Sequence, residues 1–174
     1  MLRPFRSISP RVHCSAYIDQ SAQVIGDVEI GEESSVWMNV VIRGDVNRIR
    51  IGDRTNIQDG TIVHVMRDTH ATRIGSDVTV GHAAVLHGCT IHDRVLIGMG
   101  AILLNGSEIG EDSIVAAGAL VPEGKMFPPR SLLIGRPAVL KRELSDADVA
   151  SIRDYAARYV DYRNDYMPQG HDGG

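Results

Sequence analysis

The stretch IHDRVLIGMGAILLNGSEIGEDSIVAAGALV, residues 91–121, places an aliphatic residue at every sixth position. The same spacing recurs earlier in the chain, and glycine often follows the aliphatic, as at Ile51-Gly52 and Ile74-Gly75. An α-helix repeats near 3.6 residues and a strand near 2, so neither alone produces this period. The aliphatics on the repeat are Ile18, Val24, Ile30, Val36, Ile42, Ile51, Ile57, Val63, Ile74, Val80, Leu86, Ile91, Ile97, Leu103, Ile109, Val115 and Val121.

A six-residue period fits a short strand followed by a corner. Three such units close a triangular coil of about 18 residues, with one aliphatic of each unit pointing inward and glycine at the tight corners. The coils stack at the strand spacing of about 4.8 Å and bury their apolar sides against each other. The sequence therefore predicts an all-β solenoid, with roughly six coils between residues 18 and 121. A β-sandwich is disfavoured, because its spacings would vary around 8 to 12 residues.

The chain divides into four expected segments. Residues 1–125 form the β-helix, with hexads from about residue 16, and the Pro/Gly-rich residues 126–143 are predicted to be an irregular crossover. Residues 144–167 are predicted to be a helix capped by Ser145, which packs along the solenoid or onto a neighbouring subunit. Residues 168–174 are expected to be a disordered tail. The predicted helix face comprises Val149, Ile152, Tyr155, Tyr159, Tyr162 and Tyr166.

The composition argues against several classes of partner. Of 174 residues, 18 are Lys or Arg and 22 are Asp or Glu, so the net charge is −4 and there is no basic excess for nucleic acid or an anionic membrane. No apolar run approaches the roughly 20 residues that span a bilayer, and the first residues lack the apolar centre of a signal peptide. Two cysteines make no disulfide framework. We therefore expect a cytoplasmic protein without nucleic-acid or membrane partners.

The six-residue spacing breaks between Ile42 and Ile51, between Val63 and Ile74, and after Leu86. Such departures indicate loops or bulges, which often carry function on a rigid scaffold. Two polar motifs, RGD at 43–45 and NIQDG at 56–60, lie around the first break.

Three histidines lie near these breaks. His64 follows Val63 and His87 follows Leu86, so both take the same outward position in their hexads, whereas His82 belongs to another face. Faces about 120° apart diverge outward, so these side chains cannot surround one ion within a single chain. Three histidines are a common catalytic zinc site, and the spacing suggests a trimer with a metal at each interface. Solvated surface histidines are the alternative, and the insertion leaves open which histidines pair.

Further polar residues are candidates for the same site. Arg43 and Asp59 are expected to lie near each other or near the same pair on a neighbouring chain, where an Arg–carboxylate clamp could join subunits. Gln58 and Asp45 are candidates to hydrogen-bond a metal-bound water or its substrate. His70 lies in the insertion and is a candidate mobile proton acceptor.

The set RGD (43–45), NIQDG (56–60), His64 and VGHAAVLHGC (80–89) resembles the γ-class carbonic anhydrase family of left-handed β-helix proteins. The resemblance covers nearly the whole chain. It implies a homotrimer that binds Zn²⁺, or alternatively Fe²⁺ or Co²⁺, through His64 and His87 of one subunit and His82 of the next. It also implies reversible hydration of carbon dioxide to bicarbonate by a metal-bound hydroxide, which forms because the ion lowers the pKa of water from about 15.7 to about 7.

The resemblance also implies roles for the polar residues. Gln58 would orient the hydroxide or substrate, Tyr159 would lie near the metal, and Asp45 would be adjacent. Arg43 and Asp59 would form the subunit-interface pair, and Asn56 belongs to the same NIQDG motif as an interface or structural residue.

One departure concerns proton transfer. Asp45 is followed by Val46 rather than glutamate, and the short loop after His64 contains Asp68 as its acid. The chain thus resembles the bacterial short-loop subgroup, in which weak activity is expected, with His70 or Asp68 as the candidate proton shuttle. Two other functions stay open: an acyltransferase or thioesterase acting on a coenzyme A thioester, and a non-catalytic metal-binding trimer.

Overall fold

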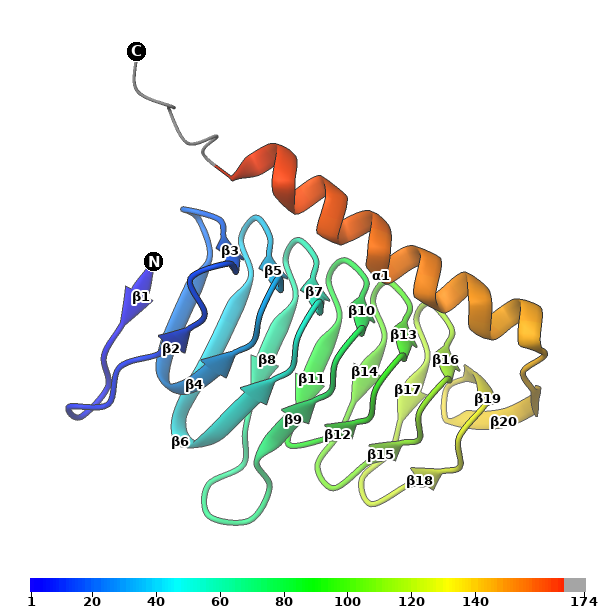
Figure 1. Cartoon of the computed structure of the whole chain (residues 1–174). Helices are drawn as coiled ribbons and strands as arrows, with labels where there is room; N and C mark the ends of the chain where they lie inside the picture. The colour runs from blue at the N-terminus through cyan, green and yellow to red at the C-terminus, as the bar shows by residue number, and fades with distance from the viewer. Residues whose placement is uncertain (168–174) are drawn as a thin grey trace.

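The computed structural model describes residues 1–167, in which the chain forms a left-handed parallel β-helix with one long helix along its side (Figure 1). The fold predicted from the hexad spacing is therefore confirmed. The predicted tail, 168–174, lies outside the described residues. No helix within residues 1–167 is long and apolar enough to cross a membrane.

The strands lie on three faces, which we call faces 1, 2 and 3. Face 1 carries the first parts of β4 (Gln23–Ile30) and β6 (Val41–Ile51), followed by β8 (Ile62–His64), β11 (Val85–His87), β14 (Ile102–Leu103) and β17 (Leu120–Val121). Face 2 carries the remaining parts of β4 and β6 together with β2 (Arg11–Val12), β9 (Thr72–Ile74), β12 (Thr90–Ile91), β15 (Glu108–Ile109) and β18 (Met126–Phe127). Face 3 carries β3 (Tyr17–Ile18), β5 (Ser35–Val36), β7 (Asn56–Ile57), β10 (Thr79–Val80), β13 (Leu96–Ile97), β16 (Ile114–Val115), β19 (Ser131–Gly135) and β20 (Ala138–Glu143). A short N-terminal strand, β1 (Leu2–Arg3), pairs with β4.

The aliphatic of each hexad points into the coil and stacks on its counterpart in the next coil. On face 1, for example, Leu86 pairs with Val63 on one side and Leu103 on the other, and all three are fully buried. Ile18 is half-buried because it lies near the open N-terminal end of the stack. Burial of this single continuous column is the main source of stability, since each coil hides its apolar side only against its neighbours.

Each break in the spacing has a structural cause. The first break is a single bent strand, β6, which runs without interruption from face 1 to face 2. The second is a loop closed by an isolated bridge between Met66 and His70. The third is a corner at Gly88, where a Cβ would lie 2.8 Å from the Cβ of His70, so glycine makes room for that loop.

Residues 126–143 differ from the prediction of an irregular crossover. They contain β18, which continues face 2, and a β19–β20 hairpin, whose first strand continues face 3. The hexad spacing in fact continues from Val121 to Phe127 and Leu133, and Leu133 is fully buried. The antiparallel β20 covers the last edge of face 3, which is how an exposed parallel edge is closed.

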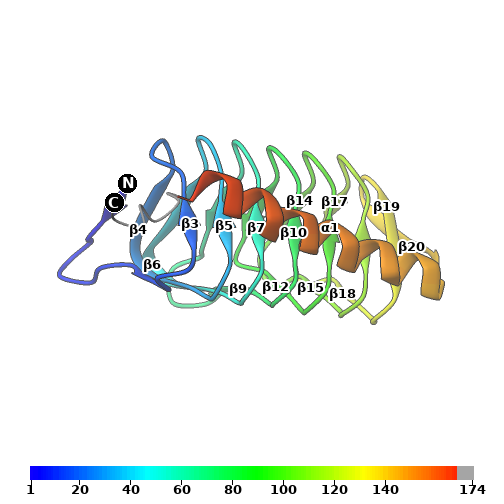
Figure 2. The ribbon, with the colours of Figure 1, turned by 45° about the horizontal axis from the view of Figure 1, so that its top comes forward.

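The long helix, α1 (Asp146–Tyr166), runs across face 3 toward the N-terminal end of the coil (Figure 2). Ser145 and Asp148 form a capping box at its start, as the cap prediction required. Val149 and Ile152 pack on the outward aliphatics of face 3, namely Leu96, Ile114 and Leu132. Tyr155, Tyr162 and Tyr166 of the predicted buried face stay 43%, 49% and 53% exposed.

Candidate metal centre

Two histidines face each other on face 1. His87 is the direct register partner of His64 on the neighbouring strand, because both follow an inward aliphatic and therefore point outward. Their rings meet edge to face with centroids 5.0 Å apart, and His64 Nδ1 lies 3.1 Å from His87 Nε2. Two ligand nitrogens around tetrahedral zinc are about 3.3 Å apart. The pair is thus spaced like two ligands of one ion.

The far nitrogen of each ring has its own partner. His64 Nε2 lies 3.0 Å from Asp45 Oδ1, and the other oxygen of that carboxylate accepts from Arg43 Nη1. His87 Nδ1 lies 2.7 Å from Asn105 Oδ1. Because a carboxylate and an amide oxygen are acceptors, both far nitrogens carry the proton. The two facing nitrogens are then left with lone pairs that repel unless a proton or a cation lies between them, so this donor set fits a metal ion.

The electrostatics favour a neutral His64. Its burial lowers the pKa of the imidazole, and the positive charge of Arg43 lowers it further against the opposing effect of Asp45. Burial alone would raise the pKa of Asp45, but hydrogen bonds from His64 and Arg43 hold it below its ordinary value. A neutral imidazole oriented by an ionised carboxylate is the form that binds a metal.

His82 lies elsewhere, at the corner after β10 on face 3. Its Nδ1 is 2.9 Å from Asp59 Oδ2, and both side chains are nearly half exposed. Within residues 1–167, no group of three or more His, Cys, Asp or Glu side chains lies close enough to hold one metal ion. A single chain therefore offers two imidazoles on one face and a third on a different face, in agreement with the divergence expected from the hexad positions.

Gln58 is fixed in a polar row beside His82. Its amide nitrogen donates to Asn56 Oδ1 at 3.0 Å, and Asn56 in turn donates to Thr79 Oγ1 at 2.9 Å. Gln58 and Asn56 are buried, so this row holds the Gln58 side chain in one orientation. Gln58, His82 and Tyr159 lie among the polar residues that line a cavity of about 440 Å³, together with Thr79 and Tyr155, and its other walls are largely aliphatic.

Tyr159 comes from α1 and lines this cavity on the side of the helix. Its ring meets Trp37 edge to face, with centroids 5.5 Å apart. Burial raises the pKa of Tyr159, and the nearby Asp59 carboxylate adds to the effect, so the phenol stays neutral and can donate its proton in a hydrogen bond. The cavity thus combines a fixed amide, an imidazole and a neutral phenol with an apolar wall.

The chain is similar along most of its length to several known proteins. It is 45% identical to Protein YrdA of Escherichia coli over 98% of this chain and 96% of that protein. It is 46% identical to Gamma carbonic anhydrase 1, mitochondrial, of Arabidopsis thaliana over 87% of this chain and 57% of that protein. It is 44% identical to the carbonic anhydrase of Geobacillus kaustophilus over 92% of this chain and 88% of that protein.

The chain belongs to the γ-class carbonic anhydrase-like family. Residues 88–123 of this γ-class chain also match the family described as bacterial transferase hexapeptide (six repeats). A crystal structure titled as a putative acetyltransferase from Bacillus cereus superimposes with a TM-score of 0.93 at 43% identity, covering 95% of this chain and 96% of that one. Both matches agree with the hexad coil. The name of the Bacillus cereus structure refers to acetyl transfer, whereas the names of the Arabidopsis and Geobacillus relatives refer to carbonic anhydrase.

One predicted contact, between Arg43 and Asp59, does not form within one chain of this γ-class protein. Arg43 pairs with Asp45, which lies two residues further along β6 and therefore on the same side of the strand. Asp59 pairs with His82 at a corner, so the intrachain Arg43–Asp59 pair is wrong. The alternative, a pair between two chains, stays a prediction.

The two candidate proton shuttles lie in the loop after β8. His70 packs beside Gly88 and its Nδ1 is 3.0 Å from Thr69 Oγ1, whereas Asp68 is exposed. Of the two, His70 therefore lies closer to the strand that carries His87.

Sequence reasoning missed Asn105 and Glu123. Asn105 accepts from His87 and donates to Glu123 Oε1 at 2.8 Å, so three outward side chains form a chain of contacts along successive coils. Their separation gives the missing signal, because each lies 18 residues after the previous one and therefore in the same outward position one coil further on.

Proposed function

We propose that the chain is a metal-dependent γ-type carbonic anhydrase that interconverts carbon dioxide and bicarbonate as a homotrimer. Zn²⁺, or alternatively Fe²⁺ or Co²⁺, would be held by His64 and His87 of one subunit and His82 of the next. The observation that carries the proposal is the His64–His87 pair, whose facing nitrogens are 3.1 Å apart and whose far nitrogens have acceptors of their own. The named carbonic anhydrases among the relatives support the same reaction.

The outward side chains of face 1 support the trimer. Beyond the polar Gln23 at its N-terminal end, a register-matched row on this face is entirely aliphatic, and Ile62 within it is 46% exposed. The row consists of Val41, Ile62, Val85, Ile102 and Leu120. The matching row of face 2 is mostly polar, with Glu29, Arg50, Arg73, Thr90 and Glu108. An aliphatic row beside His64 and His87 fits burial against a second copy, which would also bring the missing His82.

The bound ion would supply Lewis acidity, lowering the pKa of a water molecule to about 7 so that hydroxide can attack carbon dioxide. Asp45 and Asn105 keep the ligand nitrogens of His64 and His87 unprotonated. Gln58, held by Asn56, presents an oriented amide to the reacting oxygen atoms. The aliphatic wall of the adjacent cavity suits an uncharged substrate such as carbon dioxide.

The test is stopped-flow hydration of carbon dioxide by protein loaded with zinc and, separately, with iron under anaerobic conditions. We expect a rate above buffer in at least one form, and no rate above buffer in either form would overturn the activity.

His82→Ala is expected to lose bound metal although His82 does not contact His64 or His87 within one chain. Unchanged metal content in that variant would overturn the site.

The alternatives give separate results in the same experiments. An acyltransferase or thioesterase would turn over a coenzyme A thioester without hydrating carbon dioxide. Turnover of such a thioester should be measured, because a similar structure from Bacillus cereus is named as an acetyltransferase. A non-catalytic trimer would bind metal and do neither.

A further inference from the structure

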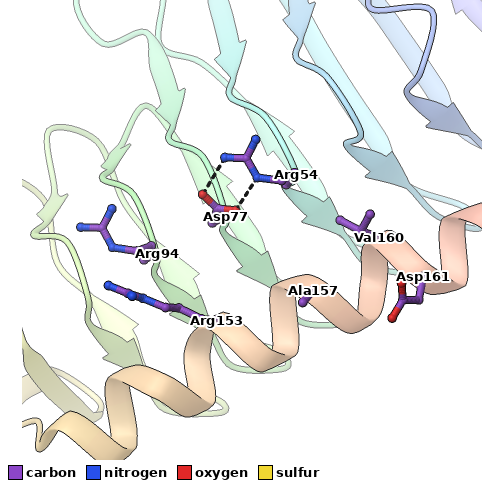
Figure 3. A pocket seen from close by; sticks show the side chains of 7 residues that line it. All are labelled: Arg54, Asp77, Arg94, Arg153, Ala157, Val160 and Asp161. Atoms are coloured by element: carbon purple, nitrogen blue, oxygen red, sulfur yellow. Dashed lines mark hydrogen bonds and ion pairs between the residues drawn. The ribbon is translucent and has the colours of Figure 1, made fainter.

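A second cavity, of about 500 Å³, lies at the opposite edge of face 3 from the candidate site (Figure 3). It is formed where α1 crosses the corner that leads from face 2 into face 3. Three arginines meet there from two different parts of the fold, two from the coil and one from the helix. Its lining residues are Arg54, Asp77, Arg94, Arg153, Ala157, Val160 and Asp161.

The two coil arginines use only part of their hydrogen-bonding capacity. Arg54 binds Asp77 through Nε and Nη2, at 2.7 and 2.9 Å. Arg94 likewise uses Nε and Nη2, which bind Asp112 and Glu111. A guanidinium has five N–H donors, so Nη1 of each arginine still has donors without a protein acceptor within residues 1–167.

Arg153 of α1 adds a whole guanidinium. It is exposed, and the bonds drawn among the lining residues in Figure 3 join Arg54 to Asp77 and do not reach Arg153. Figure 3 shows Arg94 and Arg153 beside each other at one end of the cavity, with Asp161 toward the other end. Arg94 is already paired with Asp112 and Glu111, so the charge that an anion would balance here is that of Arg153.

Three of the nearby carboxylates, Asp77, Asp112 and Glu111, are already engaged, whereas Asp161 lines the cavity toward its other end. Both oxygens of Asp77 accept from Arg54, and Asp112 and Glu111 accept from Arg94. These bonds raise the pKa of both arginines, which stay charged at every physiological pH. The charge of Arg153 therefore remains without a contacting carboxylate at the end of the cavity shared with Arg94.

We propose that this cavity binds a phosphoryl group, either as inorganic phosphate or on a small phosphorylated molecule. Guanidinium groups are the preferred partners of phosphate oxygens because their planar fork matches two acceptors at once. The ligand would bridge Arg94 of the coil and Arg153 of α1, and Ala157 and Val160 leave an apolar wall for the rest of a larger ligand. Since α1 also carries Tyr159, binding would stabilise the helix that closes the candidate site.

The test compares the thermal melting of the full chain in phosphate, in glucose 6-phosphate and in chloride at matched ionic strength. A ligand that binds the folded state raises Tm progressively with concentration. We expect a rise above the chloride value that saturates in the millimolar range, together with slower hydrogen exchange in α1. A rise with inorganic phosphate but not glucose 6-phosphate identifies free phosphate as the ligand, and the reverse identifies a phosphorylated molecule.

Variants locate the effect. Arg153→Gln is expected to weaken phosphate binding at least tenfold and to keep its fold, because Arg153 is exposed. Arg73→Gln on β9 removes an exposed arginine outside the cavity and serves as the matched control. An equal rise in Tm for Arg153→Gln and the parent chain would overturn the proposal. So would the absence of any rise above chloride with both phosphate compounds. Neither readout depends on carbon dioxide hydration.

Discussion

At the scale of single residues, the candidate metal centre depends on what lies behind each imidazole. A histidine can present either ring nitrogen, and the partner of the far nitrogen decides which one is free. Asp45 accepts from Nε2 of His64 and leaves its Nδ1 free, and Asn105 accepts from Nδ1 of His87 and leaves its Nε2 free. The two partners differ in charge, so Asp45 orients His64 with a carboxylate, whereas Asn105 orients His87 without added charge.

Asn105→Ala tests this division of roles. Loss of the amide oxygen frees His87 to rotate and to take the other tautomer, so metal affinity is expected to fall about 10- to 100-fold. The measurement is competition for zinc against a chromophoric chelator. Asn164→Ala, which removes an exposed amide on α1, is the control and should bind zinc like the parent chain. An affinity of Asn105→Ala within a factor of two of the control would contradict the role assigned to Asn105.

At the scale of the elements, the glycines that follow an inward aliphatic and the corner residues with a positive φ serve different purposes in this coil. The glycine after an inward aliphatic is needed because the next coil passes close by: a Cβ on Gly52 would lie 2.7 Å from the carbonyl carbon of Gly75. The left-handed corner positions are instead held in part by charged residues, including Arg54, Asp77 and Arg94 at φ of 50°, 56° and 54°. Their side chains form ion pairs between coils, which offsets the strain of that conformation.

Gly52→Ala is therefore expected to destabilise the chain by steric overlap, by about 1–3 kcal/mol. Gly118→Ala provides the comparison, because its φ is +67° but a Cβ there meets nothing within 4 Å. That variant carries only the cost of a left-handed alanine, roughly 1 kcal/mol. Denaturant unfolding measures both. A larger loss for Gly118→Ala than for Gly52→Ala would reverse the assignment of the two glycine roles.

The start of α1 gives a second prediction at this scale. Ser145→Ala removes the side-chain acceptor for the Asp148 backbone N–H and is expected to cost roughly 1 kcal/mol, whereas Ser151→Ala on the exposed face should be neutral.

Hydrogen bonds from Arg142, and then from Ser145, lower the pKa of Asp148. Its contribution is thus complete above the ordinary Asp pKa of about 3.9 and is lost as the pH falls below it. An acid unfolding curve of Asp148→Asn that matches the parent curve would contradict this contribution.

At the scale of the whole molecule, the hexad spacing was sufficient to predict the coil, because burial in a solenoid depends on nearest neighbours and leaves a strict period in the sequence. Residues 126–143 were misread because Pro128-Pro129 obscured a period that Phe127 and Leu133 continue. The partners of Arg43 and Asp59 could not be derived from the period, since Arg43 bonds a residue of its own strand and Asp59 bonds a residue at a corner.

The aliphatic row of face 1 leads to a prediction about assembly. Ile62 is 46% exposed in one chain, and full burial of an exposed side chain of this size contributes about 1.5–3 kcal/mol, so a homotrimer would gain roughly half of this amount at each interface. Ile62→Asp places a charge in that interface and is expected to give monomers by sedimentation at micromolar concentration. Met126→Asp on face 2 is the matched control, because Met126 is still more exposed, at 68%, yet lies outside the row, and it should remain a trimer. A parent chain that sediments as a monomer would contradict the trimer and would leave His82 without a route to His64 and His87. An Ile62→Asp variant that sediments as a trimer would place the subunit contact on a different face.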